Sequence, residues 1–139
     1  MPKSFLDTNI FVYTFDTKEP AKRNTAQNLV AQGLEDRSAA ISYQVVQEFL
    51  NVATRKFVTP MRAHEAEEYL DRVLMPLWEV FPSAALYARA LAVSASAKIH
   101  FYDALIVSSA LEAGCRILLS EDLQHGRRIG GLEIRNPFL

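Results

Sequence analysis

Cysteine is nearly absent from this sequence: Cys115 is the only one among 139 residues. A single cysteine cannot form an internal disulfide, which is typical of proteins from a reducing compartment. No stretch approaches the roughly 20 apolar residues of a membrane-spanning helix. The first residues also lack the apolar segment and cleavage pattern of a signal peptide. We therefore expect a cytoplasmic protein that has no membrane partner.

An excess of positive charge is also absent. The 15 Lys and Arg residues are balanced by 16 Asp and Glu residues, which gives a net charge of −1. The chain therefore has no overall basic field that would attract nucleic acid. A nucleic-acid substrate would have to be held by local basic groups and a metal ion. Arg55 and Lys56, at the end of a predicted helix, are two such groups, although basic residues are most often simply solvated.

Repeats, low-complexity tracts and Gly/Ser linkers are absent as well. Half of the residues are hydrophobic and 22 % are charged, as in an ordinary globular protein and unlike a disordered chain. The length suits one domain with a substantial core. We therefore expect residues 1–139 to form a single domain.

Short strand-like runs alternate with longer helical patterns along the chain. Strands are predicted over residues 3–7, 39–42, 78–81, 116–119 and 132–135, and helices over 9–15, 21–34, 44–56, 63–74, 83–95 and 101–113. Thr8 or Asn9 is expected to cap the first helix, Ser83 to cap the fifth and Gly114 to end the last. This alternation predicts an α/β fold with a mostly parallel sheet of about five strands, covered on both faces.

Four acidic residues stand where a globular domain has little structural reason to place one: Asp7, Glu48, Asp103 and Asp122. Carboxylates among apolar neighbours are costly to bury unless they are paired, hydrogen-bonded or bound to a cation. Asp7 and Asp122 also follow predicted strands, and sites in such sheets form beyond the carboxyl ends of the strands. If the fold gathers the four acids, they form an all-oxygen site for a hard divalent metal.

Each acid also has a purely structural interpretation. Asp7 suits a helix cap. Glu48 belongs to a polar stripe with positions 44, 51 and 55, which a solvated helix face explains. Asp103 gains from the helix dipole in its first turn, although its helix is predicted to be buried all round. Asp122 follows a buried strand as loop acids often do, and Glu121 competes with it for any role.

Four segments in order resemble the motifs of the PIN domain, and above all the VapC-type toxins of bacterial toxin–antitoxin pairs. The likeness covers essentially the whole chain, and its first and third motifs are the most specific. The segments are Phe5-Leu6-Asp7-Thr8-Asn9-Ile10-Phe11-Val12-Tyr13, Gln47-Glu48-Phe49, Tyr102-Asp103-Ala104-Leu105-Ile106 and Leu118-Leu119-Ser120-Glu121-Asp122-Leu123.

The resemblance implies a three-layer α/β/α fold whose acids bind Mg²⁺ or Mn²⁺ and cleave RNA. By matching motifs, Asp7, Glu48 and Asp103 would be the three core acids and Asp122 the fourth. Asn9 and Ser120 would be polar supports of the site. The family often has a basic or polar residue just before its fourth acid, whereas this chain has Glu121, so the choice between positions 121 and 122 stays open. The resemblance also implies a homodimer and a cognate antitoxin partner.

A mechanism follows as a hypothesis. Clustered carboxylates repel, which raises the pKa of at least one of them until a cation removes the repulsion. Asp7 and Asp103 are expected to be the principal metal ligands. Glu48 and Asp122 would hold metal-bound water, a second ion or the attacking water. The cation would activate water and neutralise charge on the scissile phosphate.

Other classes share part of this pattern. A receiver-like signalling domain has an acid after its first strand but needs an adjacent acidic pair there, and Thr8 and Asn9 follow Asp7 instead. A haloacid-dehalogenase-like phosphatase needs a second Asp at position 9. A catalytically weak PIN fold that only binds RNA or protein is a further alternative, which the four intact acids argue against.

Overall fold

A computed structural model describes residues 3–139, in which six strands form one sheet with the order β3–β2–β1–β4–β6–β5. Neighbouring strands are parallel except β5 and β6, which are antiparallel. The strands are β1 (Ser4–Leu6), β2 (Ala39–Ser42), β3 (Trp78–Val80), β4 (Ile117–Leu119), β5 (Arg128–Ile129) and β6 (Leu132–Arg135). The predicted α/β class is confirmed, with six strands where about five were expected.

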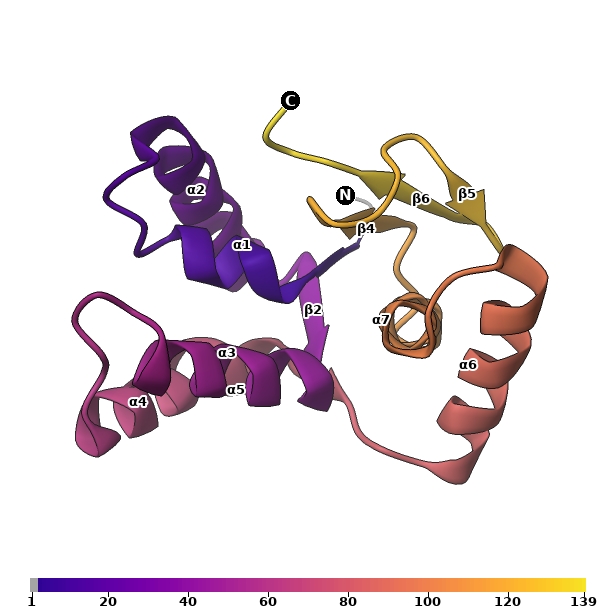
Figure 1. The fold of residues 1–139 in the computed structure, drawn as a ribbon, viewed down its shortest axis with the longest axis horizontal. Helices are drawn as coiled ribbons and strands as arrows, with labels where there is room; N and C mark the ends of the chain where they lie inside the picture. The colour runs from indigo at the N-terminus through magenta and orange to yellow at the C-terminus, as the bar shows by residue number, and fades with distance from the viewer. Residues whose placement is uncertain (1–2) are drawn as a thin grey trace.

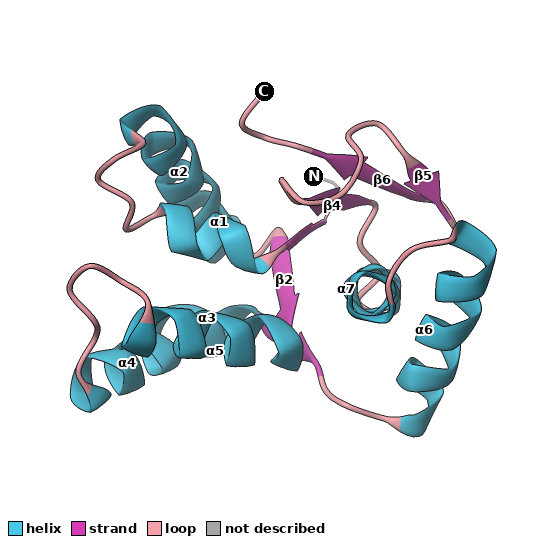
Figure 2. Ribbon diagram, in the orientation of Figure 1, coloured by secondary structure: helices cyan, strands magenta, loops and turns pink. Residues whose placement is uncertain are grey.

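Helices flank this sheet on both sides, as the predicted layers require. In Figure 1, α1 to α5 lie to the left of β2 and β4, whereas α7 and α6 lie to the right, below β6 and β5, and Figure 2 shows the same arrangement with the strands in magenta. The helices are α1 (Thr8–Tyr13), α2 (Pro20–Asp36), α3 (Tyr43–Arg55), α4 (Ala63–Tyr69), α5 (Met75–Leu77), α6 (Ala84–Ala97) and α7 (Phe101–Glu112).

The strand order reverses between β1 and β4. From β1 the chain adds β2 and then β3 on one side, whereas β4 lies on the other side. Open α/β sheets bind ligands at such a switch point, beyond the carboxyl ends of the strands. The order also differs from the 2-1-3-4-5 order of flavodoxin-like folds, to which receiver domains belong. The receiver alternative therefore does not fit this sheet.

The sixth strand, β5, was not predicted. It joins β6 through Gly130 and Gly131, with Ile129 paired to Leu132. Both glycines have positive φ, of 57° and 84°, as a two-residue hairpin of type I′ requires. A strand of two residues is too short to show an alternating pattern, but the Gly-Gly pair was a readable hairpin signal.

The helix predicted over residues 63–74 is longer and irregular. α4 ends at Tyr69, a π-helical turn (η1) covers Leu70–Leu74, and α5 continues to Leu77. The wide turn lies just before Pro76, whose ring clashes with the carbonyl four residues earlier in a regular α-helix. Hydrophobic spacing does not reveal such a change of helical period.

Helix α7 is the most buried helix, as its lack of charge predicted. Seven consecutive residues, from position 104 to position 110, are buried. Asp103, one of its two charged residues, lies in the first turn. Within residues 3–139, no single helix is long and apolar enough to cross a membrane, and α6 and α7 reach that composition only as a pair bent by 116°.

Candidate functional site

Asp7 lies at the switch point of the sheet, between the end of β1 and the start of α1. Its side chain is 7 % exposed. Its Oδ1 accepts a 2.7 Å hydrogen bond from the Thr8 amide, and its Oδ2 accepts one of 2.7 Å from the Ser120 hydroxyl. Asp7 is therefore the N-cap of α1, and the expectation that Thr8 or Asn9 caps this helix was wrong. Asp7 therefore caps α1 and also lies among the acids of the candidate site.

Burial has a large effect on the Asp7 carboxyl. Desolvation raises the pKa of Asp7 from its ordinary value of 3.8 to about 6, against the opposing effect of the hydrogen bonds from Ser120 and Thr8. The negative charges of Asp122 and Glu48 raise this pKa further. A carboxylate in this position is therefore unfavourable when no cation accompanies it.

Asp122 lies in the loop after β4 and is tied to Asp7 through Ser120. The Ser120 hydroxyl accepts a 3.1 Å hydrogen bond from the Asp122 amide while it donates to Asp7. The Asn9 side-chain amide donates a 3.1 Å hydrogen bond to Asp122 Oδ2. The predicted supports Asn9 and Ser120 therefore contact predicted acids directly.

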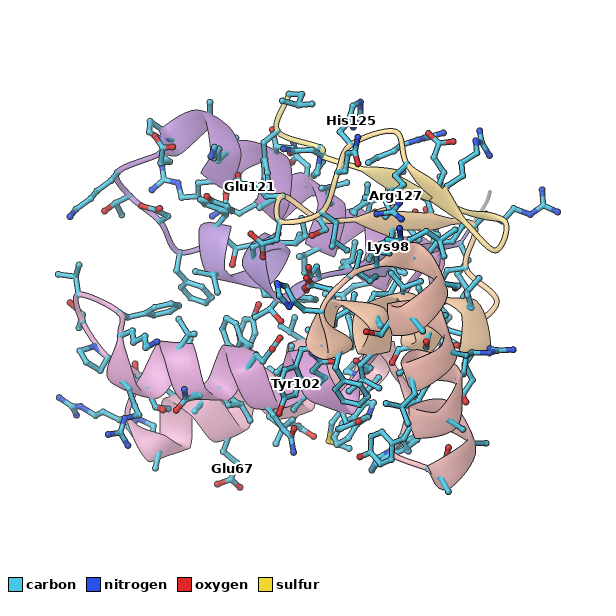
Figure 3. The ribbon with its side chains drawn as sticks, turned by 45° about the vertical axis from the view of Figure 1, so that its right-hand side comes forward. Glu67, Lys98, Tyr102, Glu121, His125 and Arg127 are labelled. Atoms are coloured by element: carbon cyan, nitrogen blue, oxygen red, sulfur yellow. The ribbon has the colours of Figure 1, made fainter. Side chains whose placement is uncertain are left out.

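Glu48 lies on α3 and faces the start of α1. The Thr8 hydroxyl donates a 2.6 Å hydrogen bond to its Oε1, and the Gln44 amide lies 3.5 Å from its Oε2. The same Gln44 amide donates to the Tyr102 carbonyl of α7 over 3.2 Å. Gln44 is buried rather than solvated, so it connects the helix of Glu48 to the helix of Asp103. Figure 3 labels Tyr102 at this junction.

Asp103 occupies the first turn of α7 and is half-buried. Desolvation raises its pKa, the charge of His100 lowers it and the charge of Asp122 raises it. Its carboxylate is not among the hydrogen-bonded groups within residues 3–139. Asp103 is thus coupled to the other acids by charge, whereas Asp7, Glu48 and Asp122 are linked by the hydrogen bonds of Thr8, Asn9 and Ser120.

Glu121 turns away from these acids. Its carboxylate accepts hydrogen bonds of 2.7 Å from the Tyr13 hydroxyl and 2.8 Å from Lys22 Nζ. Burial opposes its ionisation, but the contacts with Lys22 and Tyr13 prevail and leave the pKa of Glu121 below its ordinary value. Figure 3 shows Glu121 beside α1 and α2. Its negative charge is therefore locally neutralised by Lys22.

An open cleft of about 630 Å³ lies over this region. Glu48, Glu121 and Asp122 line it, together with Thr8 and Asn9. Asp7 and Asp103 are not among its lining residues within the described chain. Among residues 3–139, Lys56 is the only basic residue that lines the cleft.

The donor chemistry of the site suits a hard divalent cation. All four side chains offer carboxylate oxygens, and Asn9 Oδ1 is buried without a hydrogen-bond partner. Within residues 3–139, no three acidic, His or Cys side chains are arranged to hold a metal ion as they stand. Glu48 and Asp122 are engaged by Thr8 and Asn9 instead, so both would have to turn toward a shared ion. The residues fit Mg²⁺ or Mn²⁺ in kind, and the carboxylates of Asp7, Glu48 and Asp122 are held by hydrogen bonds.

Sequence reasoning missed three contributors to this arrangement. Thr8 was considered only as a cap, although it lies within the Asp7-Thr8-Asn9 segment. Gln44 was assigned to a solvated stripe, although its spacing of four residues from Glu48 placed the two on one helix face. The contact between Lys22 and Glu121 joins residues that are 99 positions apart, and no local signal predicts it.

The family model of the PIN domain matches residues 4–130. Comparison with curated protein sequences found no significant match.

Several solved structures share the fold along most of the chain. A toxin–antitoxin complex from Klebsiella pneumoniae matches with a TM-score of 0.68 and 19 % identity, over 97 % of this chain and 98 % of that one. VapBC2 from Rickettsia felis, bound to a DNA fragment from its promoter, matches with a TM-score of 0.65 and 22 % identity, over 96 % of this chain and 97 % of that one. VapC20 from Mycobacterium tuberculosis, described as a sarcin–ricin loop cleaving toxin, matches with a TM-score of 0.63 and 17 % identity, over 86 % of this chain and 90 % of that one.

Proposed function

Because the chain belongs to the PIN domain family, we propose that it is a metal-dependent ribonuclease that hydrolyses RNA phosphodiester bonds through Asp7, Glu48, Asp103 and Asp122. We further propose that residues 1–139 act as one domain and as the toxin of a VapBC-type pair. The names of the similar structures from Klebsiella pneumoniae and Rickettsia felis support an antitoxin partner. A homodimer and a cytoplasmic location belong to the same proposal.

The buried Asp7 carboxyl is the observation that carries the proposal. A helix cap does not require a buried carboxylate, whereas Asp7 is 7 % exposed and is repelled by Asp122 and Glu48. Such an arrangement costs free energy in the absence of a cation. A function that requires a cation at this point accounts for that cost.

The contacts of Asp7, Glu48 and Asp122 support the proposed roles. Asp7 and Asp103 would hold Mg²⁺ or Mn²⁺ directly, and Glu48 and Asp122 would hold water beside it. The bound ion supplies charge neutralisation at phosphate and a more acidic water.

Ser120 fixes the orientation of Asp7, and Asn9 fixes that of Asp122. Thr8 holds Glu48 on the same side of the cleft. Asp122 is favoured over Glu121 as the fourth acid because Glu121 is paired with Lys22.

The test is cleavage of a single-stranded RNA by the wild type, by Asp103→Asn and by Asp71→Asn, each with Mn²⁺ and with EDTA. Asp71 is an exposed acid on the π turn and serves as the matched control. We expect Asp103→Asn to lose cleavage by more than about 100-fold while Asp71→Asn keeps it. Cleavage that persists in EDTA, or in Asp103→Asn, would contradict the proposal.

A second candidate is a catalytically weak PIN fold that binds RNA or protein. It is favoured by one observation: within residues 3–139, no three acids are arranged to hold a metal as they stand. This candidate predicts that the wild type binds RNA without cutting it in Mg²⁺ or Mn²⁺. The same cleavage assay, run beside a binding measurement, distinguishes the two candidates.

A further inference from the structure

A second cavity opens beside the acidic cleft. It measures about 470 Å³, within the usual size range of ligand pockets. Its walls come from the connection between α1 and α2 and from the connection between α3 and α4, which lie one above the other at the left of Figure 1. The apolar side chains that line it are Val12, Phe15, Val52, Phe57 and Val58.

This cavity, which we call the aromatic pocket, is continuous with the acidic cleft. Val12, Asp16, Val52 and Lys56 line both hollows. An extended ligand that crosses the cleft therefore meets the aromatic pocket next, and Lys56 lies where the two join.

Phe15 presents a fixed aromatic ring to the pocket. Its ring centroid lies 5.3 Å from that of Phe57, 5.5 Å from that of Tyr69 and 6.0 Å from that of Phe49. Phe49 is completely buried, so the cluster is anchored in the core. Phe15 nevertheless remains 40 % exposed. A large aromatic ring that is held in place and still exposed is a suitable surface for stacking.

The charged side chains at the rim favour a polyanion. Lys18 and Lys56 line the pocket, and neither has an acidic partner within 4.0 Å among residues 3–139. Asp16 also lines the rim, and its carboxylate accepts a 2.9 Å hydrogen bond from the Lys18 amide. Two unpaired cations beside an apolar, aromatic floor match a nucleotide, which joins an anionic phosphate to a flat base. An apolar protein segment would leave both cations without a counterpart.

We propose that the aromatic pocket is a base-binding subsite for RNA, in which a nucleobase next to the scissile phosphate stacks on Phe15 and the adjoining phosphate contacts Lys56. This inference rests on the proposed function, since it assumes that the RNA crosses the acidic cleft. It adds a source of substrate selection, because the four bases differ in size and in stacking strength. Lys18 is placed to meet the next phosphate along the strand.

The test uses a fluorescein-labelled single-stranded RNA whose cleaved bond is first mapped with the wild type. The same RNA is then made with an abasic residue on either side of that bond. KM and kcat in Mn²⁺ are measured for the wild type, for Phe15→Leu and for the control Phe81→Leu. Phe81 is 57 % exposed and stacks on Trp78 in another part of the molecule. Melting temperatures verify that each variant folds.

We expect Phe15→Leu to raise KM for the intact RNA about tenfold while kcat changes little. For one of the two abasic RNAs, the wild type and Phe15→Leu should have equal KM, because the stacking partner is already missing. Phe81→Leu should match the wild type throughout. A Phe15→Leu protein with wild-type KM, or with the same increase on both abasic RNAs, would overturn the proposal and leave an apolar protein segment as the occupant.

A binding measurement separates this proposal from the proposed function. Fluorescence anisotropy with the same RNAs in Ca²⁺ gives Kd without any need for cleavage. If the wild type does not cut RNA but Phe15→Leu weakens binding about tenfold, the hydrolysis proposal fails and the base subsite stands. If cleavage occurs and Kd is the same for both proteins, the hydrolysis proposal stands and the subsite fails. Lys56→Gln should also make the salt dependence of Kd shallower by about one phosphate contact, whereas Arg89→Gln on α6 should not.

Discussion

The Ser120 hydroxyl donates a 2.7 Å hydrogen bond to Asp7 Oδ2, although 113 positions separate the two residues in the chain. The pairing of β1 with β4 brings them together. Leu6 lies opposite Leu119, so Asp7 and Ser120, the residues that follow them, meet at the same edge of the sheet. Ser120 is completely buried, so this hydrogen bond is shielded from water. It joins the two halves of the sheet at the point where the proposed metal site lies.

Removal of this hydroxyl should destabilise the protein in a pH-dependent way. In EDTA at about pH 7.5, Ser120→Ala should lower the free energy of unfolding by about 2 kcal/mol, as expected for a hydrogen bond to an ionised group. Below the Asp7 pKa of about 6 the carboxyl is neutral, so the loss should be smaller near pH 5. Urea unfolding measures both values. Ser108→Ala is the control, since its buried hydroxyl has no hydrogen-bond partner within the described chain and should cost little. Equal losses for the two variants would contradict this account.

The ionisation of Asp7 should reduce the stability of the metal-free protein above pH 6. Its pKa is raised by burial from 3.8 to about 6, so between these values the folded state binds more protons than the unfolded state. The contribution of Asp7 to the free energy of unfolding is therefore greatest near pH 4. It is lost as pH rises through 6, by up to about 3 kcal/mol. Asp7→Asn should be more stable than the wild type at about pH 7.5 and no more stable near pH 4. Urea unfolding in EDTA at the two pH values measures the difference, and a pH-independent loss would indicate that Asp7 acts as a cap alone.

Divalent cations should stabilise the folded protein. At a concentration about 100 times the Kd, Mg²⁺ or Mn²⁺ should add about 2.7 kcal/mol to the free energy of unfolding, because only the folded state assembles the site. Asp103→Asn should lose most of this gain, and Asp71→Asn should retain it. Zn²⁺ is not expected to be the natural ion, since the predicted ligands include no Cys or His. Thermal unfolding with and without each ion tests this, and a melting temperature that no cation changes would refute it.

The two neighbouring acids after β4 should behave differently. Asp122→Asn should reduce RNA cleavage by more than about 10-fold, whereas Glu121→Gln should change it only slightly, because Lys22 already neutralises Glu121. Cleavage rates in Mn²⁺, with melting temperatures as a check on folding, decide between them. A larger loss in Glu121→Gln would assign the fourth acidic position to residue 121.

RNA binding should depend only weakly on salt. The net charge is −1, and the aromatic pocket is lined by Lys18 and Lys56, neither of which has an acidic partner within 4.0 Å among residues 3–139. Two phosphate contacts to a single strand predict a slope of about −1.4 in a plot of log K against log salt. Titrations at several salt concentrations measure this slope. A value steeper than about −3 would mean that further basic residues contact the RNA.

The sequence predicted the fold well where hydrophobic spacing was regular. The strands at 39–42 and 132–135 were located at their observed bounds, and the sparsely charged helix at 101–113 is indeed the buried α7. Spacing failed where the backbone departs from a regular period. The π turn before Pro76 and the two-residue strand β5 are such places, because each depends on local backbone geometry rather than on a repeated pattern.

The sequence by itself determined which acidic residues are available for the proposed chemistry: four acids in ordered motifs, at the ends of strands or on helices that begin near them. Only the tertiary structure decided how these acids are held, since the hydrogen bonds that link one acid's segment to another join parts distant in the chain. Thr8 binds Glu48, Asn9 binds Asp122, and Lys22 removes Glu121 from the group. Sequence patterns record which side chains are present and which face of an element they occupy. The direction in which a carboxylate turns depends on donors that arrive from other elements, and packing alone places those donors.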